Sequence, residues 1–205
     1  IVGGPPCQGF SMAGRRDQND PRNSLFMEFH KYITYFKPKV FVMENVRGIL
    51  SMKMADGTKC IKVILDHLEQ EYVCRVDKLY ASHFGVPQNR CRVIITGIRK
   101  DLGIVPPPYT PTTPPPDLPA IGPWLVARED VDPKQFLSQR AKDGIARKRQ
   151  KMLERGHGFG AQIIDPTRPC YTIPARYWKD GYDALVEYDD GELRRLNVIE
   201  LKRVQ

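Results

Sequence analysis

Long apolar runs, a paired set of cysteines and metal-ligand spacings are all missing from this sequence. No stretch is long and apolar enough for a transmembrane helix and no signal peptide is visible, so we expect an intracellular protein with no membrane partner. The five cysteines are an odd number without metal-ligand spacing. They predict reduced thiols and no bound metal.

Positive charge, in contrast, is in excess. The 205 residues have a formal net charge of +8 and an isoelectric point near 9.3, and 41% of them are hydrophobic. This length is sufficient for one hydrophobic core and a small second lobe. The charge suits a polyanionic partner, although many basic proteins never bind nucleic acid.

The first hundred residues have the pattern of an α/β protein. Residues 40–43 form a short apolar run, as expected for a parallel strand covered on both faces. Before them, Asn23 or Ser24 can cap a helix that ends at Pro38. The apolar stripe of this helix comprises Leu25, Phe26, Phe29, Ile33 and Phe36. Further strands are predicted at 1–4, 72–80 and 92–98, and a further helix at 61–68. This alternation predicts a doubly wound sheet.

The character of the chain changes after Lys100. Residues 106–116 are rich in proline, which excludes a central strand or a helix interior and predicts a linker or a domain edge. Residues 140–155 are dense in positive charge, which fits either a solvated helix face or a phosphate-contacting surface. Short β-like pieces follow at 171–173 and 184–186.

Short motifs are more specific. Cys7 follows two prolines on a glycine-flanked turn, directly after an apolar start. Four further blocks follow in order: Asp20 to Phe26, Pro38 to Gly48, Gly85 to Arg92, and a late block with Arg194, Arg195, Leu196, Glu200, Arg203 and Gln205. In this order the blocks resemble the DNA cytosine-5 methyltransferase family.

The resemblance implies a fold and a division of the chain. The expected fold is α/β, with a doubly wound, Rossmann-like S-adenosylmethionine-dependent methyltransferase sheet and a smaller, mostly β target-recognition region. Residues 1–102 would belong to the catalytic core, 103–190 to the linker and recognition region, and 191–205 to a return into the core. The implied partner is double-stranded DNA, and we expect a monomer. By the resemblance, the protein would lie in the cytoplasm or nucleoid of a bacterium, or in the nucleus of a eukaryote.

Cytosine carbon 5 is a poor nucleophile, so its methylation needs covalent activation. Attack of a cysteine thiolate on carbon 6 makes carbon 5 nucleophilic, and Cys7 is the candidate. A protonated carboxyl near ring nitrogen 3 would neutralise the charge that develops on the ring. Glu44 follows a buried strand, where partial desolvation favours the acid form. Arg92 is expected to donate to the cytosine O2.

Three further residues are expected to support this site. By the resemblance, Asn45 orders the proline-cysteine loop through a hydrogen bond. Gln88 and Arg90 are expected to brace that loop or to bind a phosphate, because they share one face of an extended segment with Arg92. The alternative interpretation of the candidate residues is structural: a small buried hydrophobe for Cys7, a helix-capping or salt-bridging carboxylate for Glu44, and solvent-facing strand residues for Arg90 and Arg92.

The target carbon lies inside a stacked duplex, so the base must be flipped out before the thiol can reach it. In the family the loop after the cysteine closes over the flipped base, and residues 11–20 have suitable flexibility and charge. An exposed loop without a special role is the alternative. The candidate DNA contacts, in this loop and in the recognition region, are Ser11, Arg15, Arg16, Arg176, Tyr177 and Lys179.

The implied methyl donor is S-adenosylmethionine. The family's glycine-rich turn and two acidic donor-binding residues belong upstream of the cysteine turn, and its closing motif follows Gln205. We therefore expect a fragment of a longer enzyme that does not methylate by itself. The candidate donor contacts that remain are Pro6, Arg22 and Leu25.

Two other functions are open. A tRNA cytosine-5 methyltransferase shares the fold and the first motifs, but its usual Cys-Phe-Thr signature and its asparagine at the position of Gln88 are not seen here. A catalytically silent, methyltransferase-like DNA-binding protein would explain the missing donor pocket. The presence of Cys7, Glu44 and Arg92 together argues against it.

Overall fold

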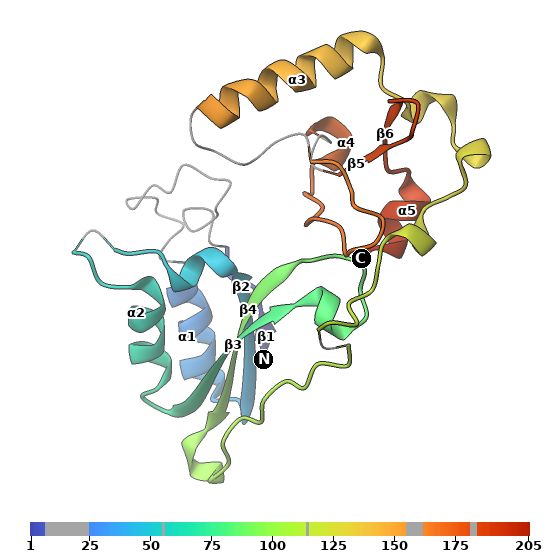
Figure 1. Cartoon of the computed structure of the whole chain (residues 1–205). Coiled ribbons are helices and arrows are strands. Elements are labelled where there is room, and N and C mark those ends of the chain that lie inside the picture. Colours follow the sequence, from blue (N-terminus) through green and yellow to red (C-terminus); the bar gives the residue numbers. More distant parts are fainter. Residues whose placement is uncertain (7–24, 55, 114, 155–161, 181–183) are drawn as a thin grey trace. The chain divides into compact units, whose positions relative to one another are not determined.

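The computed structural model describes residues 1–6, 25–54, 56–113, 115–154, 162–180 and 184–205. These form two compact units, which we describe one at a time (Figure 1). Unit 1 contains residues 1–79 and 91–110, and unit 2 contains residues 80–90 and 111–205. The boundaries between the two units are set by which residues contact one another. The expected division at residues 102 and 190 instead separates catalytic from recognition residues. That division stays a prediction.

Unit 1 is built on a sheet with the strand order β1-β2-β4-β3. The strands are β1 (Val2–Gly3), β2 (Val40–Val46), β3 (Tyr72–Tyr80) and β4 (Cys91–Arg99). β1 is parallel to β2, whereas β2 is antiparallel to β4. The sheet is therefore mixed. Residues 81–90, which join β3 to its neighbour β4, are fewer than the roughly one dozen that a parallel crossover needs.

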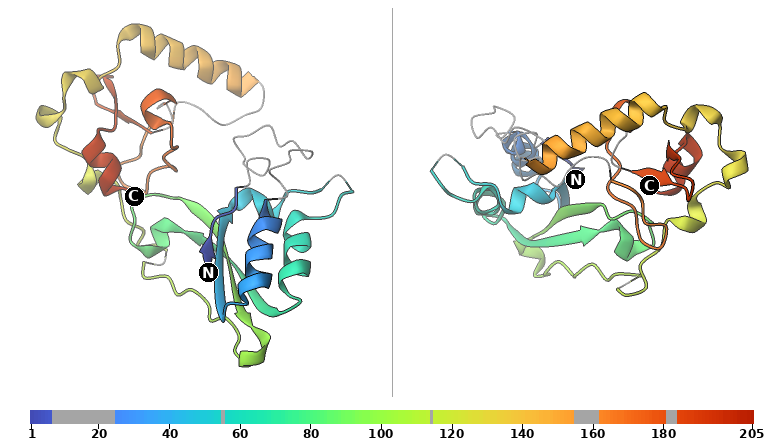
Figure 2. Two further views of the ribbon diagram at one scale, coloured as in Figure 1. Left: turned by 180° about the vertical axis from the view of Figure 1, so that it is seen from behind. Right: turned by 45° about the horizontal axis from the view of Figure 1, so that its top comes forward.

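Two helices, α1 (Phe26–Phe36) and α2 (Cys60–Leu68), lie side by side against one face of this sheet, as both views show (Figures 1 and 2). Their apolar stripes meet β2 and β4 in a core that includes Phe29, Ile33, Phe41, Met43, Ile49, Ile64, Leu68, Tyr72, Val93 and Ile95. The predicted stripe of α1 is one residue too long, because Phe36 is 62% exposed. The predicted capping residues 23 and 24 lie outside the described residues.

The core of unit 1 requires glycine at two positions. A Cβ on Gly97 in β4 would lie 2.1 Å from the ring of Phe41, and a Cβ on Gly3 would lie 2.6 Å from the ring of Phe29. Along β2, Phe41 and Met43 are buried while Val42 is partly exposed. Within the described residues, β2 is therefore covered fully on one face, not on both as its apolar run predicted.

Unit 2 contains less β structure than we predicted. Its helices are α3 (Gln139–Glu154), α4 (Tyr177–Asp180) and α5 (Val198–Arg203), and its strands β5 (Leu185–Glu187) and β6 (Leu193–Arg195) form an antiparallel pair. The prediction of a mostly β recognition region is wrong for the described residues, because α3 is the longest element and each strand has three residues. Residues 171–173 belong to no strand.

Single turns of 3-10 helix connect these elements. In unit 1 they are η3 (Arg47–Leu50) and η5 (Lys100–Leu102), and in unit 2 they are η4 (Ala81–Phe84), η6 (Gly122–Trp124), η7 (Arg128–Asp130) and η8 (Pro133–Gln135). The proline-rich stretch has neither helix nor strand among its described residues, as predicted. No described helix has the length and apolar character needed to span a membrane.

A buried ion pair holds the late part of unit 2. The guanidinium of Arg194 in β6 donates two hydrogen bonds of 2.8 Å to the carboxylate of Glu200 in α5, and both side chains are fully buried. Glu200 also accepts from the backbone amides of Asn197 and Val126. Burial alone raises the pKa of Glu200, but the hydrogen bonds from Arg194 and the two amides outweigh it and leave this pKa below its ordinary value.

Candidate functional site

The parallel strands β1 and β2 end at the same edge of the unit 1 sheet, and polar groups collect there. Asn45, near the end of β2, is only 3% exposed. Its side-chain nitrogen donates to the carbonyl of Pro5 at 3.4 Å, and its oxygen accepts from the Val46 amide at 2.9 Å. Asn45 therefore ties the end of β2 to the backbone two residues before Cys7.

An ion pair joins β2 to β4 at the same edge. The carboxylate of Glu44 lies 2.6 Å from Nε of Arg92, and Nη1 of Arg92 donates to the carbonyl of Cys91. Val46 and Arg92 are opposite each other in the strand register, which brings the two side chains together. The Glu44 side chain is 43% exposed, so the burial that we expected around it is not present in the described residues. Its role as a proton donor to the ring stays a prediction.

Gly4 lies beside this carboxylate, a feature that we did not predict. A Cβ at Gly4 would lie 3.4 Å from the second carboxylate oxygen of Glu44. The adjacent glycines at 3 and 4, directly after an apolar start, are the signal that could have indicated a close approach of the chain.

Cys7 lies outside the described residues, but the other cysteines can be assessed. Burial raises the pKa of Cys60, and it raises the pKa values of Cys74 and Cys170 to about 12. A thiol needs its thiolate form to act as a nucleophile, so a raised pKa disfavours that role for these three near neutral pH. Among the described residues, no group of His, Cys, Asp and Glu side chains could hold a metal ion.

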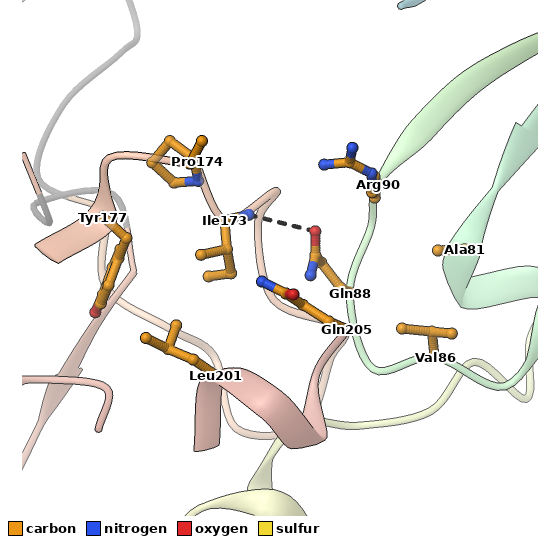
Figure 3. Close-up of a pocket in the computed structure, with 10 residues that line it drawn as sticks. Ala81, Val86, Gln88, Arg90, Ile173, Pro174, Tyr177, Leu201 and Gln205 are labelled. Atoms are coloured by element: carbon orange, nitrogen blue, oxygen red, sulfur yellow. Dashed lines mark hydrogen bonds between the residues drawn. The ribbon is translucent and has the colours of Figure 1, made fainter. Parts of the chain in front are cut away.

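The structure places Gln88 and Arg90 in unit 2, before the first residue of β4. Gln88 is 2% exposed, and its side chain donates to the carbonyl of Val204 at 2.7 Å and accepts from the amide of Ile173 at 3.3 Å. Figure 3 shows the bond to Ile173 beside the exposed Arg90. Both polar atoms of the Gln88 side chain thus have hydrogen-bond partners within unit 2. The cysteine loop lies outside the described residues, so the bracing of that loop or of a phosphate by Gln88 and Arg90 stays a prediction.

These residues border a pocket of about 600 Å³ in unit 2. Its lining is mostly apolar and comes from the loop after η4, from residues 173–177 and from α5 (Figure 3). Arg90 points towards this space from the opposite side to Tyr177. The pocket therefore combines apolar walls with the guanidinium of Arg90 and the side-chain amides of Gln88 and Gln205.

Tyr177 belongs to the core of unit 2 and not to its surface. It is 4% exposed, and its hydroxyl donates to the carbonyl of Ala184 at 2.6 Å and accepts from the amide of Leu196 at 2.9 Å. Burial raises its pKa to about 12. We expected Tyr177 to read a base edge, but this burial leaves it no exposed polar group for that role. Arg176 and Lys179 are exposed.

The remaining predicted residues are only partly visible. Ser11, Arg15, Arg16 and Arg22 lie outside the described residues. Of the predicted donor contacts, Pro6 is exposed, and Leu25 is half-buried immediately before α1.

Comparison with known proteins identifies the family. The model of the C-5 cytosine-specific DNA methylase family matches residues 1–205. The chain belongs to this family. The C-5 cytosine-specific DNA methylases that it resembles include the Type II methyltransferase M1.ScrFI of Lactococcus lactis subsp. cremoris, which is 34% identical over 100% of this chain and 52% of the relative.

Other members share parts of the chain or its fold. The Type II methyltransferase M.DdeI of Desulfomicrobium norvegicum is 51% identical over 107 residues, which are 49% of this chain and 25% of that relative. The solved Dnmt2 methyltransferase of S. pombe has a TM-score of 0.61 and 16% identity, over 99% of this chain and 64% of that one. This likeness shows the α/β methyltransferase fold. The chain spans about half the length of full-coverage relatives such as M1.ScrFI.

Proposed function

We propose that the intact protein transfers a methyl group from S-adenosylmethionine to carbon 5 of a cytosine that is flipped out of duplex DNA. Family membership supports the reaction class. The observation that carries the proposal is the grouping of Asn45, Glu44 and Arg92 at the edge where β1 leads into Cys7. In open α/β sheets, ligands bind at the carboxyl ends of the strands.

Cys7 is the proposed nucleophile. Its thiolate adds to carbon 6 of cytosine, and the electron pair of the 5,6 double bond makes carbon 5 nucleophilic. After methylation, the proton on carbon 5 is removed, the sulfur–carbon bond breaks, and the double bond forms again. The hydrogen bond from Asn45 to Pro5 fixes the backbone near Cys7, which favours one direction of attack.

Glu44 and Arg92 are proposed to hold the base. Their contact of 2.6 Å places a carboxyl and a guanidinium side by side, which matches the adjacent O2 and N3 of the ring edge. Arg92 would donate to O2, and Glu44 would share a proton with N3 as negative charge develops on the ring. The bond from Arg92 to the Cys91 carbonyl limits the freedom of the guanidinium before the base arrives.

S-adenosylmethionine supplies an electrophilic methyl group when bound. Of its predicted contacts, Pro6 and Leu25 are described. These two residues do not define a pocket for a ligand of that size, so we assign no step to residues around the donor.

Covalent trapping tests the proposal. The intact protein is incubated with S-adenosylmethionine and duplex DNA that carries 5-fluorocytosine, because fluorine at carbon 5 cannot leave as a proton does and the adduct persists. We expect a mass increase equal to one methylated DNA strand on the wild type and on Cys74→Ser, and none on Cys7→Ser. Cys74 is a matched control because burial raises its pKa to about 12.

Three other results of this experiment would each lead to a different conclusion. An adduct on Cys7→Ser would exclude Cys7 as the nucleophile. An adduct on 5-fluorocytosine RNA and none on DNA would assign the protein to the tRNA branch. If neither substrate gives an adduct, the catalytically silent DNA-binding protein is the better description.

A further inference from the structure

Helix α3 carries a stripe of cations that nothing else in the described part of unit 2 neutralises. The helix holds six basic residues and two acidic ones. Arg140, Arg147 and Lys151 are spaced by seven and four residues, so they lie on one face of the helix, and all three are exposed. Within the described residues, none of the three has a hydrogen-bond or ion-pair partner. We call these three residues the α3 stripe.

The cation on the inner side of the same helix is paired. Lys142 lies 2.9 Å from the carboxylate of Glu192 and its side chain is 18% exposed. The apolar residues Ala141 and Ile145 pack against Leu137 and Leu185. Because these apolar residues in the first half of α3 are already buried in unit 2, they are not available to insert into a lipid surface. Leu153 near the end of the helix is exposed, but a single apolar side chain does not form a lipid-binding face. The α3 stripe is therefore suited to a hydrated, polyanionic partner.

Gly144 lies between Arg140 and Arg147 on this face. Glycine in a helix interior is unfavourable relative to alanine. A Cβ at Gly144 would meet no atom of the described chain within 4 Å, so the packing of unit 2 does not require a glycine here. Arg140, Gly144 and Arg147 line a hollow of about 460 Å³. The missing side chain allows an external group to approach the helix backbone between two guanidinium groups.

We propose that the α3 stripe binds the phosphate backbone of duplex DNA, with one phosphate seated over Gly144. This rests on the proposed function, which makes duplex DNA the substrate. From Arg140 to Lys151 the helix rises about 16 Å, which is close to the rise of five base pairs at about 3.4 Å each. The stripe can thus contact phosphates along one strand, and such contacts add affinity and position the duplex without reading sequence.

The salt dependence of DNA binding tests the proposal. The triple variant Arg140→Gln/Arg147→Gln/Lys151→Gln is compared with Lys31→Gln/Lys62→Gln/Lys134→Gln, which removes the same charge from exposed positions elsewhere. The Kd of the intact protein for labelled duplex DNA is measured between about 0.05 and 0.3 M salt. We expect the slope of log K against log salt to become shallower by about 2 to 3 in the first variant, because each lost phosphate contact removes about 0.9.

The control variant should retain the wild-type slope to within about one unit, since it loses no phosphate contact. Equal changes in the two variants would show a general effect of net charge and overturn the proposal. An unchanged slope in the α3 variant would also overturn it. Neither result bears on the proposed reaction, which is judged by the Cys7 adduct on the wild type.

Gly144→Ala separates binding from folding. Alanine favours the helix and meets no neighbour, so the melting temperature should stay equal or rise. The methyl group would displace a phosphate from the helix, so we expect DNA affinity to fall several-fold. A variant that binds DNA as tightly as the wild type would exclude a phosphate at Gly144. If wild-type protein binds RNA and not duplex DNA through the stripe, the assignment to DNA is wrong.

Discussion

Unit 1 and unit 2 provide hydrogen-bond partners for their backbone groups in different ways. In unit 1, β2 and β4 pair over seven residue positions, while β5 and β6 in unit 2 pair over three. Unit 2 instead relies on side chains that bond to the backbone, such as Gln88, Tyr177 and Glu200. Both of the fully buried charged residues among those described, Arg194 and Glu200, belong to unit 2.

This difference has a physical origin. Buried backbone groups need partners, and a chain with little regular structure must obtain them from side chains. Each such side chain then serves several backbone groups at once, so its loss affects several segments. In unit 1, many hydrogen bonds between neighbouring strands pair the buried backbone groups, and an apolar core holds the sheet and helices together. We therefore expect polar substitutions to damage unit 2 most, and steric ones to damage unit 1.

The largest expected effect is from Arg194→Met. It keeps a long side chain but leaves the Glu200 carboxylate buried without its cation, and breaking a buried pair costs about 3–5 kcal/mol. We expect the free energy of unfolding of unit 2 to fall by that amount. Hydrogen exchange at the amides of Val126 and Leu196 should accelerate, while amides in β2 stay protected.

The change in stability at acidic pH provides a control for this variant. Because the pKa of Glu200 is lowered in the folded protein, its stabilising contribution is present above the unfolded value of about 4.3 and is lost as the pH falls through the folded pKa. Arg194→Met should therefore show a smaller loss of stability on acidification than the wild type. An equal acid response in the two proteins would mean that the pair is not the source of the stability.

Gly97→Ala is the steric counterpart in unit 1. A Cβ 2.1 Å from the Phe41 ring forces the ring or the strand to move, and overpacking of this kind costs about 1–3 kcal/mol. Thermal denaturation should show this loss. The double variant with Phe41→Leu should recover part of it, whereas the matched change Gly144→Ala should be neutral or stabilising. Strictly additive losses in the double variant would contradict a direct clash.

The smallest expected effect on stability is from Glu44→Gln. Its ion pair with Arg92 is partly exposed, and such pairs contribute about 0–1 kcal/mol. Methyl transfer should nevertheless fall by about 10²–10⁴-fold if Glu44 acts as the acid. A comparison of melting temperature with single-turnover methylation separates the two effects. Full activity in this variant would remove Glu44 from the proposed mechanism.

The elements of unit 1 were largely predictable from local pattern. The predicted strands at 72–80 and 92–98 and the helix at 61–68 agree with β3, β4 and α2 to within one residue. The direction of β4 was not predictable from periodicity, because the period of a strand is the same in parallel and antiparallel sheets.

Unit 2 was harder to predict for two reasons. Three-residue pieces such as 171–173 and 184–186 are too short for periodicity to distinguish a strand from a loop. The second overlaps β5, whereas the first belongs to no strand. The burial of Tyr177 depends on Ala184 and Leu196, which are distant in sequence. One local signal was available, since Asn197 and Glu200 have the spacing of a capping box, and the structure contains that box.

The bond from the Val126 amide to Glu200 joins positions 74 residues apart. It fixes the two ends of a long stretch of chain, and the entropy of closing such a loop rises by only about 0.6 kcal/mol when its length doubles. A change in the length of an exposed loop between these anchors therefore has little influence on the entropy of bringing the anchors together.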